Sequence, residues 1–195
     1  MTVNDPATDM PSPPLRPAVF LDRDGVLNRI VWRDGKPASP RLAEEFEIEP
    51  QALTALEALK AAGYALFVVT NQPDVARGRM SSSVLEAMHA HLTAALPVEA
   101  VSACLHDDAD ACACRKPKPG QLLALARRHG LDLSRSWMVG DQDRDIACGR
   151  AAGCSTVLLA RAYNSGRGAD VVTDELWQAA CTIADTGAAK GHACL

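Results

Sequence analysis

Aspartates follow two apolar runs of this sequence, at positions where a folded sheet would bring them together. The run AVFLD (18–22) continues into Asp24, and WMVGD (137–141) ends in Asp141. Carboxylate oxygens are ligands that Mg²⁺ prefers, and a carboxylate can also attack phosphorus to form an aspartyl-phosphate. A second carboxylate two residues further on can protonate a leaving oxygen and later activate water. Asp22, Asp24 and Asp141 are therefore candidates for metal-assisted phosphoryl transfer.

Other residue types suited to phosphate follow a second apolar run and a basic stretch. Thr70 and Asn71 end the run ALFVVTN (65–71), and Lys116 lies in CRKPKPG. A hydroxyl and a cation can stabilise a transferring phosphoryl group, which predicts that role for Thr70 and Lys116. Aspartate at a strand end is also ordinary turn chemistry. The whole set in this order, more than any single residue, therefore indicates a reaction.

Soft metal ligands gather in CLHDDADACACRKPKPG (104–120). Three sulfurs and one imidazole make a complete tetrahedral zinc set without an open position, which indicates a structural metal. The spacing differs from that of a zinc finger, and the alternatives are a disulfide or a chance cluster. The predicted zinc ligands are Cys104, His106, Cys112 and Cys114.

Several segments resemble, in the same order, the motifs of the haloacid dehalogenase-like (HAD) phosphatases. FLDRDGVLN is similar to their Asp-x-Asp-x-Thr/Val motif, VVTN to the second motif, Lys116 to the third and VGDQDRD to the fourth. The likeness covers about residues 18–160. It implies that Asp22 is the nucleophile and Asp24 the general acid/base. It also implies Mg²⁺ on Asp22, the Asp24 carbonyl and Asp141.

The likeness extends to one branch of that superfamily. A Cys-x-His…Cys-x-Cys loop followed by CRKP, together with NQPDVARG (71–78), resembles the branch that contains D-glycero-D-manno-heptose 1,7-bisphosphate phosphatases and histidinol-phosphate phosphatases. In that branch the Arg and Lys after the last Cys contact substrate phosphate. Asp145 matches a second acidic position that acts through water. The substrate-binding residues expected here are Arg23, Asn71, Arg115 and Gln142.

Two departures from that branch fall where a substrate would be recognised. Pro73-Asp74 replaces the usual Ser-Gly, which adds a negative charge and removes a backbone N–H. The segment 29–49 also differs, and its irregular sequence predicts a flap. Trp32 in this flap either contacts a sugar face or packs internally. The reaction is therefore better defined than the substrate.

Four basic or imidazole side chains have two possible roles. Arg77 and Arg79 either bind a second phosphate or belong to the solvated surface, and we favour the surface. His89 and His91 lie on a predicted helix, and we expect both to be surface residues.

Strands and helices alternate along the chain to position these residues. We expect buried strands at 18–22, 65–71, 98–104, 137–141 and 156–160, and a short strand at 171–172. Helices are expected at 50–63, 83–96, 119–130, 143–152 and 175–184. This alternation predicts an α/β fold with a mainly parallel sheet. With the resemblance, it implies a Rossmann-like HAD fold that has helices on both faces and a minimal cap, formed by the flap and the zinc loop.

Composition predicts one soluble domain. Of the 195 residues, 48% are hydrophobic and 23% charged, and the net charge of −4 gives no general attraction for nucleic acid or membranes. No apolar run approaches the roughly 20 residues of a membrane span. We predict a disordered lead-in at 1–17, one HAD-like domain at 18–186 with a zinc loop at 104–114, and a flexible tail at 187–195.

The expected protein is a cytoplasmic Mg²⁺-dependent phosphatase with a structural Zn²⁺. Seven cysteines, an odd number, without a secretory signal favour a reducing compartment. The expected substrate is a small sugar phosphate, with heptose bisphosphate first and histidinol phosphate as the alternative. We expect a monomer with no nucleic-acid or membrane partner. A non-catalytic phosphate-binding module is the alternative of another class, although binding alone would not need both a nucleophile and an acid/base.

Overall fold

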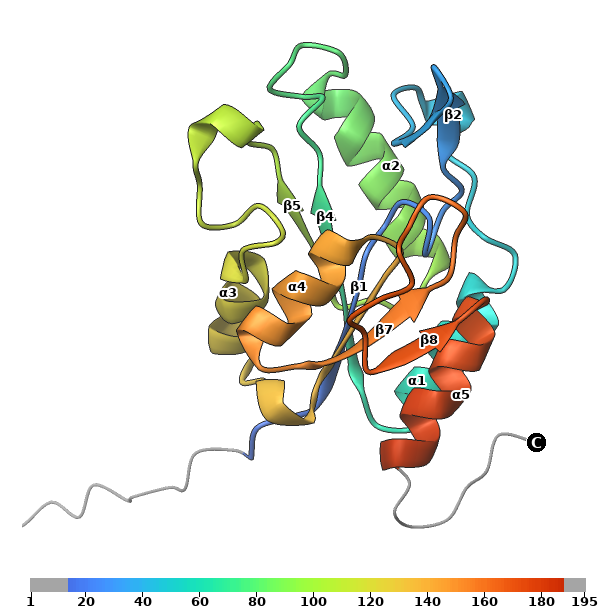
Figure 1. Ribbon diagram of the computed structural model, residues 1–195, viewed down its shortest axis with the longest axis vertical. Helices are drawn as coiled ribbons and strands as arrows, with labels where there is room; N and C mark the ends of the chain where they lie inside the picture. The colour runs from blue at the N-terminus through green and yellow to red at the C-terminus, as the bar shows by residue number, and fades with distance from the viewer. Residues whose placement is uncertain (1–13, 188–195) are drawn as a thin grey trace, which may run out of the picture.

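Six parallel strands form the central sheet, in the order β5-β4-β1-β6-β7-β8 (Figure 1). The computed structural model describes residues 14–187. Every strand of this sheet was predicted, and the observed ends lie within about two residues of the prediction. The strands are β1 (Ala18–Leu21), β4 (Ala65–Asn71), β5 (Ala100–Cys104), β6 (Trp137–Gly140), β7 (Ser155–Leu159) and β8 (Val171–Thr173).

Helices cover both faces of this sheet, which confirms the predicted α/β fold class (Figure 1). Alternate residues of the central strand β1 point to opposite faces. Val19 and Leu21 pack with α1, α2 and α5, whereas Ala18 and Phe20 pack with α3 and α4. The helices are α1 (Ala52–Ala61), α2 (Ser82–Ala95), α3 (Gly120–His129), α4 (Asp143–Ala152) and α5 (Leu176–Gly187).

The register of the sheet brings three strand ends together. Leu21, the last residue of β1, is paired with Val68 of β4 on one side and with Val139 of β6 on the other. The residues that directly follow these positions therefore lie at one edge of the sheet. In open parallel sheets ligands bind at this edge.

The flap contains regular structure, which corrects the expectation of an irregular segment at 29–49. Strands β2 (Val31–Arg33) and β3 (Lys36–Ala38) form an antiparallel hairpin. Asp34 and Gly35 make its turn with positive φ angles of 51° and 70°, and Asp-Gly is a favoured pair for such a turn. Trp32 is exposed and meets the ring of Tyr163 edge-on, with 6.1 Å between centroids.

Both chain ends extend the ordered fold slightly beyond the predicted domain. The N–H of Arg16 donates to the carbonyl of Gly130 at 3.0 Å, and its side chain pairs with Glu99, so order begins before Ala18. Gly187, which was predicted to be in the tail, ends helix α5. The rest of the predicted lead-in (1–13) and tail (188–195) lies outside the described residues. Within 14–187, no helix is long and apolar enough to cross a membrane.

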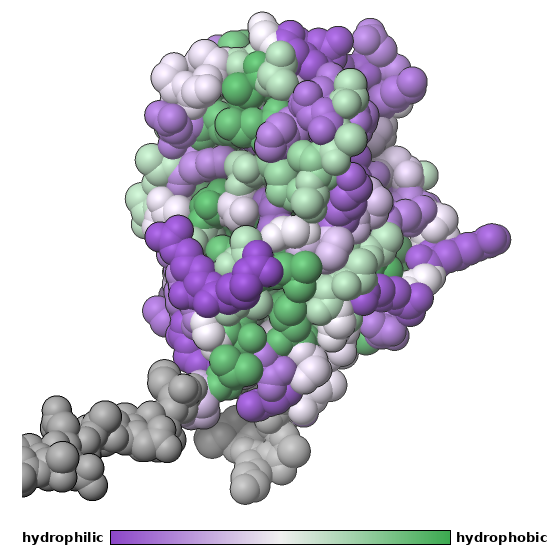
Figure 2. Space-filling view, turned by 90° about the vertical axis from the view of Figure 1, so that its left-hand side faces the viewer, coloured by the Kyte–Doolittle hydropathy of each residue, from purple (hydrophilic) through white to green (hydrophobic). Residues whose placement is uncertain are grey.

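The side of the molecule that carries α3 and the edge strand β5 has a mixed surface. Hydrophilic side chains border the apolar ones across this face (Figure 2). The segment with the cysteines and His106 follows β5 and is drawn in yellow-green beyond the strand end in Figure 1. Its regular structure is one short 3-10 helix, Asp108–Asp110.

Candidate active site

Buried charges of both signs meet at the carboxyl end of β1. The Nζ atom of Lys116 lies 2.8 Å from Oδ1 of Asp22 and 2.7 Å from Oδ1 of Asp145. It also donates to the carbonyl of Val69 at 2.9 Å. All three charged side chains are buried, so the ammonium group compensates two carboxylates that have little access to water.

Burial and mutual repulsion disfavour ionisation of these carboxyl groups. Burial raises the pKa of Asp22 to about 7; Asp145 and Asp141 add to the rise, and Lys116 opposes it. Burial and the charge of Asp145 raise the pKa of Asp141 to about 6. Burial would lower the pKa of Lys116, but Asp145 and Asp22 raise it above its ordinary value. Three acidic groups thus share one ammonium group, and a divalent cation would relieve their repulsion.

The carboxylate oxygens have the chemistry of a magnesium site. One oxygen from each of Asp22, Asp141 and Asp145 lies within 4.8 Å of the others. Oδ1 of Asp141 is buried and has no hydrogen-bond partner, so its lone pairs are free to bind a metal ion. Hard oxygen donors with free lone pairs suit Mg²⁺. The structure thus brings the predicted ligands Asp22 and Asp141 together. It also places a carboxylate oxygen of Asp145 in the same group, although Asp145 was expected to act on the metal only through water.

Neighbours that the sequence analysis missed hold Asp141 in place. The hydroxyl of Tyr163 donates to Oδ2 of Asp141, and Asn164 Nδ2 donates to the Asp141 carbonyl at 2.9 Å. Both residues follow β7, so the strand-end rule that found Asp141 also points to this loop. Gly25 has a φ of 84°, and a Cβ there would lie 2.2 Å from Oδ2 of Asp141. The motif therefore requires glycine at this position.

Asp24 accepts hydrogen bonds from several directions. Arg23 donates from Nη2 at 2.9 Å and from Nε at 3.1 Å. On the other side, Asn28, Ser39 and Gln72 donate at 3.0, 2.8 and 2.7 Å. Burial alone would raise the pKa of Asp24, but Arg23 and these hydrogen bonds lower it below its ordinary value. The carboxylate is therefore ionised before a substrate arrives.

Two side chains have different positions from those expected. Arg23, predicted to bind substrate, is completely buried and does not line the cavity. Its guanidinium points into the fold instead, where it forms hydrogen bonds with the carboxylate of Asp24 and the ring of His89. His89, predicted to be a surface residue, is partly buried against Arg23, whereas His91 is exposed as expected.

Thr70 and Asn71 both line the cavity, as expected from their place at the end of β4. Oγ1 of Thr70 accepts a hydrogen bond from Gln72 at 2.9 Å. The side chain of Asn71 and the backbone of Lys116 exchange two hydrogen bonds, each 3.1 Å long. Asn71 thus fixes the backbone that presents Lys116 to Asp22.

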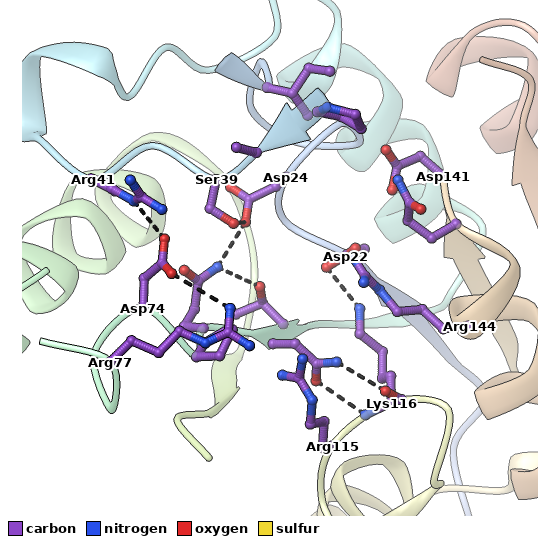
Figure 3. A pocket seen from close by; sticks show the side chains of 18 of the residues that line it. Asp22, Asp24, Ser39, Arg41, Asp74, Arg77, Arg115, Lys116, Asp141 and Arg144 are labelled. Carbon is purple, nitrogen blue, oxygen red and sulfur yellow. Dashed lines mark hydrogen bonds and ion pairs between the residues drawn. The ribbon is translucent and has the colours of Figure 1, made fainter. Parts of the chain in front are cut away.

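A cavity of about 360 Å³ opens over Asp22 and is rimmed by basic side chains (Figure 3). Arg115 and Gln142, which were predicted to bind substrate, both line it. Arg77 and Arg79 were expected to belong to the solvated surface, but they also line the cavity. The arginines around the cavity are Arg41, Arg77, Arg79, Arg115 and Arg144, of which Arg41 and Arg144 were not identified from the sequence.

Asp74 does not leave an unbalanced negative charge in the cavity. Its Oδ2 lies 2.6 Å from Nε of Arg41, and its Oδ1 lies 3.8 Å from Arg77 and 3.7 Å from Arg79. Arg41 belongs to the flap, so this ion pair also ties the flap to the segment after β4 (Figure 3).

The cysteines and His106 form a compact cluster. Sγ of Cys114 lies 3.2 Å from Sγ of Cys104, 3.5 Å from Sγ of Cys112 and 3.3 Å from Nδ1 of His106. Tetrahedral zinc with bonds of about 2.3 Å would separate its sulfurs by about 3.8 Å. The thiols form no disulfide. The predicted ligand set is thus assembled, with spacings close to those of a zinc site.

Salt bridges join this loop to the cavity rim. Nε of Arg115 donates to Asp108 at 2.6 Å, and the guanidinium of Arg77 donates to Asp107. Lys118 donates to the carbonyls of Ala111 and Cys112 at 2.9 and 2.8 Å. The position of the loop therefore sets the position of the basic residues that face the cavity.

A buried carboxylate at the end of the central strand, beside a lysine and further carboxylates, is the arrangement of a class of phosphoryl-transfer enzymes with a parallel α/β fold. The HAD-hydrolase-like family profile matches residues 113–178. A D-glycero-β-D-manno-heptose-1,7-bisphosphate 7-phosphatase from Pseudomonas aeruginosa is 40% identical over 149 residues, which are 74% of this chain and 81% of that protein. The chain belongs to the HAD-like phosphatases, in the family of the heptose 1,7-bisphosphate 7-phosphatases. It is thus a phosphoric monoester hydrolase.

Two further relatives match a larger share of this chain and support the same family. A D-glycero-α-D-manno-heptose-1,7-bisphosphate 7-phosphatase from Mycobacterium bovis is 36% identical and covers 89% of this chain and 93% of that protein. The crystal structure of D,D-heptose 1,7-bisphosphate phosphatase from B. bronchiseptica, complexed with magnesium and phosphate, superposes with a TM-score of 0.74 at 31% identity. It covers 87% of this chain and 99% of that one, which confirms the HAD fold.

Proposed function

We propose that the protein removes the 7-phosphate of a D-glycero-D-manno-heptose 1,7-bisphosphate, with Mg²⁺ at the carboxylates and through an aspartyl-phosphate on Asp22. One observation carries the choice of a bisphosphate. A single cavity contains the buried nucleophile at its base and five arginines around it. One phosphate would lie against Asp22 while the other meets guanidinium groups, which bind phosphate in bidentate geometry. The names of the relatives from Pseudomonas aeruginosa and Mycobacterium bovis support the same substrate.

In the first step, an oxygen of Asp22 attacks phosphorus as the bond from phosphorus to the sugar oxygen breaks. Thr70 and Lys116 stabilise the phosphoryl group through a hydroxyl and a positive charge. Asp24 gives its proton to the leaving oxygen. Mg²⁺, held by Asp22, the Asp24 carbonyl and Asp141, with Asp145 beside them, would neutralise negative charge on the phosphoryl oxygens.

In the second step, water attacks the phosphorus of the aspartyl-phosphate and Asp24 takes up the proton, which frees Asp22 and inorganic phosphate. The low pKa of Asp24 suits this role as base. The first step instead needs Asp24 protonated. A dianionic phosphate close to Asp24 would raise its pKa, because a nearby negative charge disfavours the ionised carboxylate. Substrate binding would thus prepare the acid.

We also propose that Cys104, His106, Cys112 and Cys114 hold a structural Zn²⁺. The short spacings among their ligand atoms support this, as does the absence of a disulfide among these thiols. Reduced thiolates persist in reducing compartments, so we propose that the enzyme is cytoplasmic. We also propose that it acts as a monomer. Zinc would keep Arg115 and Lys116 at the cavity, with Asn71 and Gln142 completing the substrate contacts.

The test is a comparison of kcat/KM over a panel of phosphates with Mg²⁺. The panel contains both anomers of D-glycero-D-manno-heptose 1,7-bisphosphate, the corresponding 1-phosphate and 7-phosphate, hexose bisphosphates and histidinol phosphate. We expect one heptose bisphosphate anomer to rank first and to lose only its 7-phosphate. A higher value for histidinol phosphate or a hexose bisphosphate would reject the substrate but keep the phosphatase. Release of the 1-phosphate would reject the proposed regiochemistry.

A further inference from the structure

The guanidinium of Arg23 is enclosed at the back of the site, although its position in the chain lies between the two catalytic aspartates. It is the largest fully buried side chain among the described residues. Two of its nitrogens donate to the carboxylate of Asp24, and its Cζ atom lies over the ring of Phe46, 5.4 Å from the centroid. A planar, delocalised cation held in this way has a fixed orientation.

His89 occupies the remaining side of this guanidinium. Its Nε2 lies 3.2 Å from Nη1 of Arg23. Arginine can only donate hydrogen bonds, so Nε2 must be the acceptor and His89 must be neutral. Burial, with a further contribution from the charge of Arg23, lowers the pKa of His89 to about 4, which keeps the ring neutral near pH 7. His89 thus satisfies a donor that has no access to water.

The hydrogen bonds of Asp24 divide into an internal and an external group. Those from Arg23 come from the interior, where no ligand can reach. Asn28 is also buried outside the cavity lining, whereas Ser39 of the flap and Gln72 line the cavity (Figure 3). A substrate can therefore replace the donors that line the cavity, while the internal donors, with Arg23 bound to both oxygens, keep the carboxylate in one orientation.

We propose that His89 and Arg23 act as a positioning unit that aims the carboxylate of Asp24 at the leaving oxygen of the substrate. The inference rests on the proposed role of Asp24 as general acid. Neither residue touches the substrate. His89 fixes the guanidinium, and the guanidinium fixes both oxygens of Asp24. Loss of His89 leaves a buried N–H of Arg23 without a partner and frees the guanidinium to rotate.

Leaving-group dependence separates this role from a merely structural one. A sugar alkoxide leaves only with a proton, whereas 2,4-dinitrophenolate leaves without one. In His89→Ala we expect kcat/KM to fall about 100-fold for the heptose bisphosphate, which is the scale of general acid catalysis. For 2,4-dinitrophenyl phosphate we expect a fall of less than about threefold, because its kcat/KM reports the first step only and needs no acid.

Three further variants make the test specific. His89→Gln keeps an oxygen acceptor near the position of Nε2 and should restore most of the activity with the sugar phosphate. The side chain of Asn is one methylene shorter than that of Gln, so its amide does not reach the position of Nε2. His89→Asn should therefore behave like His89→Ala, and it provides a second measurement if the alanine variant does not fold. His91→Ala is the matched control, because this exposed histidine lies on the same helix and meets Phe46 edge-on at 6.2 Å. It should leave both substrates unchanged.

Equal losses for the two substrates in His89→Ala and His89→Asn would overturn the inference, and so would full activity in both variants. Failure of the proposed function has a different signature. In that case the wild-type protein itself would not hydrolyse the heptose bisphosphate, whatever the variants do. Mannose 6-phosphate, another sugar phosphate, would then serve as the alkyl substrate for the same ratio.

Discussion

Asp22, Asp141 and Asp145 form a carboxylate cluster that is wholly buried at the ends of the central strands. Cys104, His106, Cys112 and Cys114 form a thiol cluster that begins at the end of the edge strand β5. Cys104 is buried, Cys112 and Cys114 are half-buried, and His106 is exposed. In the carboxylate cluster the ammonium group of Lys116 pairs with Asp22 and Asp145, and the cluster opens into a cavity. The thiol cluster is complete in itself, with four ligands directed at one another. Both have the composition of a metal site, but only the first has room for a reacting group.

This difference indicates which of the two clusters depends on a bound metal to keep its conformation. Hydrogen-bonded strands hold Asp22 and Asp141 in place, and the first turn of helix α4 holds Asp145, so the geometry of the cluster exists without an ion. The loop with the thiols contains one 3-10 turn and a few salt bridges. A metal would therefore supply charge in one cluster and structure in the other, and the following predictions test this division.

The largest effect is expected at the centre of the carboxylate cluster. Asp22→Asn removes the nucleophile, so kcat for the heptose bisphosphate should fall at least about 10⁴-fold. The amide also removes a buried charge, so the metal-free variant should melt no lower than the wild type. Steady-state kinetics and calorimetry measure the two quantities. Zinc content, measured by mass spectrometry, should stay unchanged, and a loss of zinc would contradict the separation of the clusters.

The next effect is expected in the thiol cluster. Cys112→Ser should release zinc and lower kcat/KM about 100-fold, because the loop that aims Arg115 and Lys116 would move by about 1 Å. The melting temperature should fall as well. The residual activity should keep the Mg²⁺ dependence of the wild type. Cys181→Ser on helix α5 is the control and should change neither zinc content nor rate. Full activity in a verified zinc-free protein would refute the bracing role.

A smaller effect concerns protons that compete with Mg²⁺. Because the pKa values of Asp22 and Asp141 are raised to about 7 and about 6, these carboxyls are protonated at lower pH and must lose protons when Mg²⁺ binds. Affinity should therefore rise with pH and be about 20-fold weaker at about pH 6 than at about pH 8. Titration calorimetry in buffers of different ionisation enthalpy would also detect the released protons. An affinity that does not change with pH would argue against the raised values.

The smallest effect is expected at the link between the thiol loop and the cavity rim. Asp107→Asn weakens the surface salt bridge to Arg77, which is screened by solvent. KM should rise by no more than about twofold, and kcat should stay constant. An increase comparable to that of Cys112→Ser would mean that salt bridges, rather than zinc, hold the loop.

Patterns that lie within short segments of sequence predicted most of the fold. Each strand of the main sheet is a short apolar run, and several of these runs end in the polar residue that the site uses. The hairpin in the flap was missed because its strands have only three residues each, too few for an alternating pattern, although Asp34-Gly35 is a turn signal. The roles of Arg23 and His89 were missed for another reason. Burial of a charged side chain depends on partners that are distant in sequence.

The sequence by itself determined the types of chemical group and the strand ends that carry them, since both are local properties of the chain. It determined the membership of the thiol cluster for the same reason, because its residues lie within a span of eleven. Only the tertiary structure decided that Lys116 lies between Asp22 and Asp145, that Tyr163 supports Asp141, and that Arg23 turns inward to His89. These contacts join segments tens of residues apart, and packing of the sheet and helices sets which of them meet.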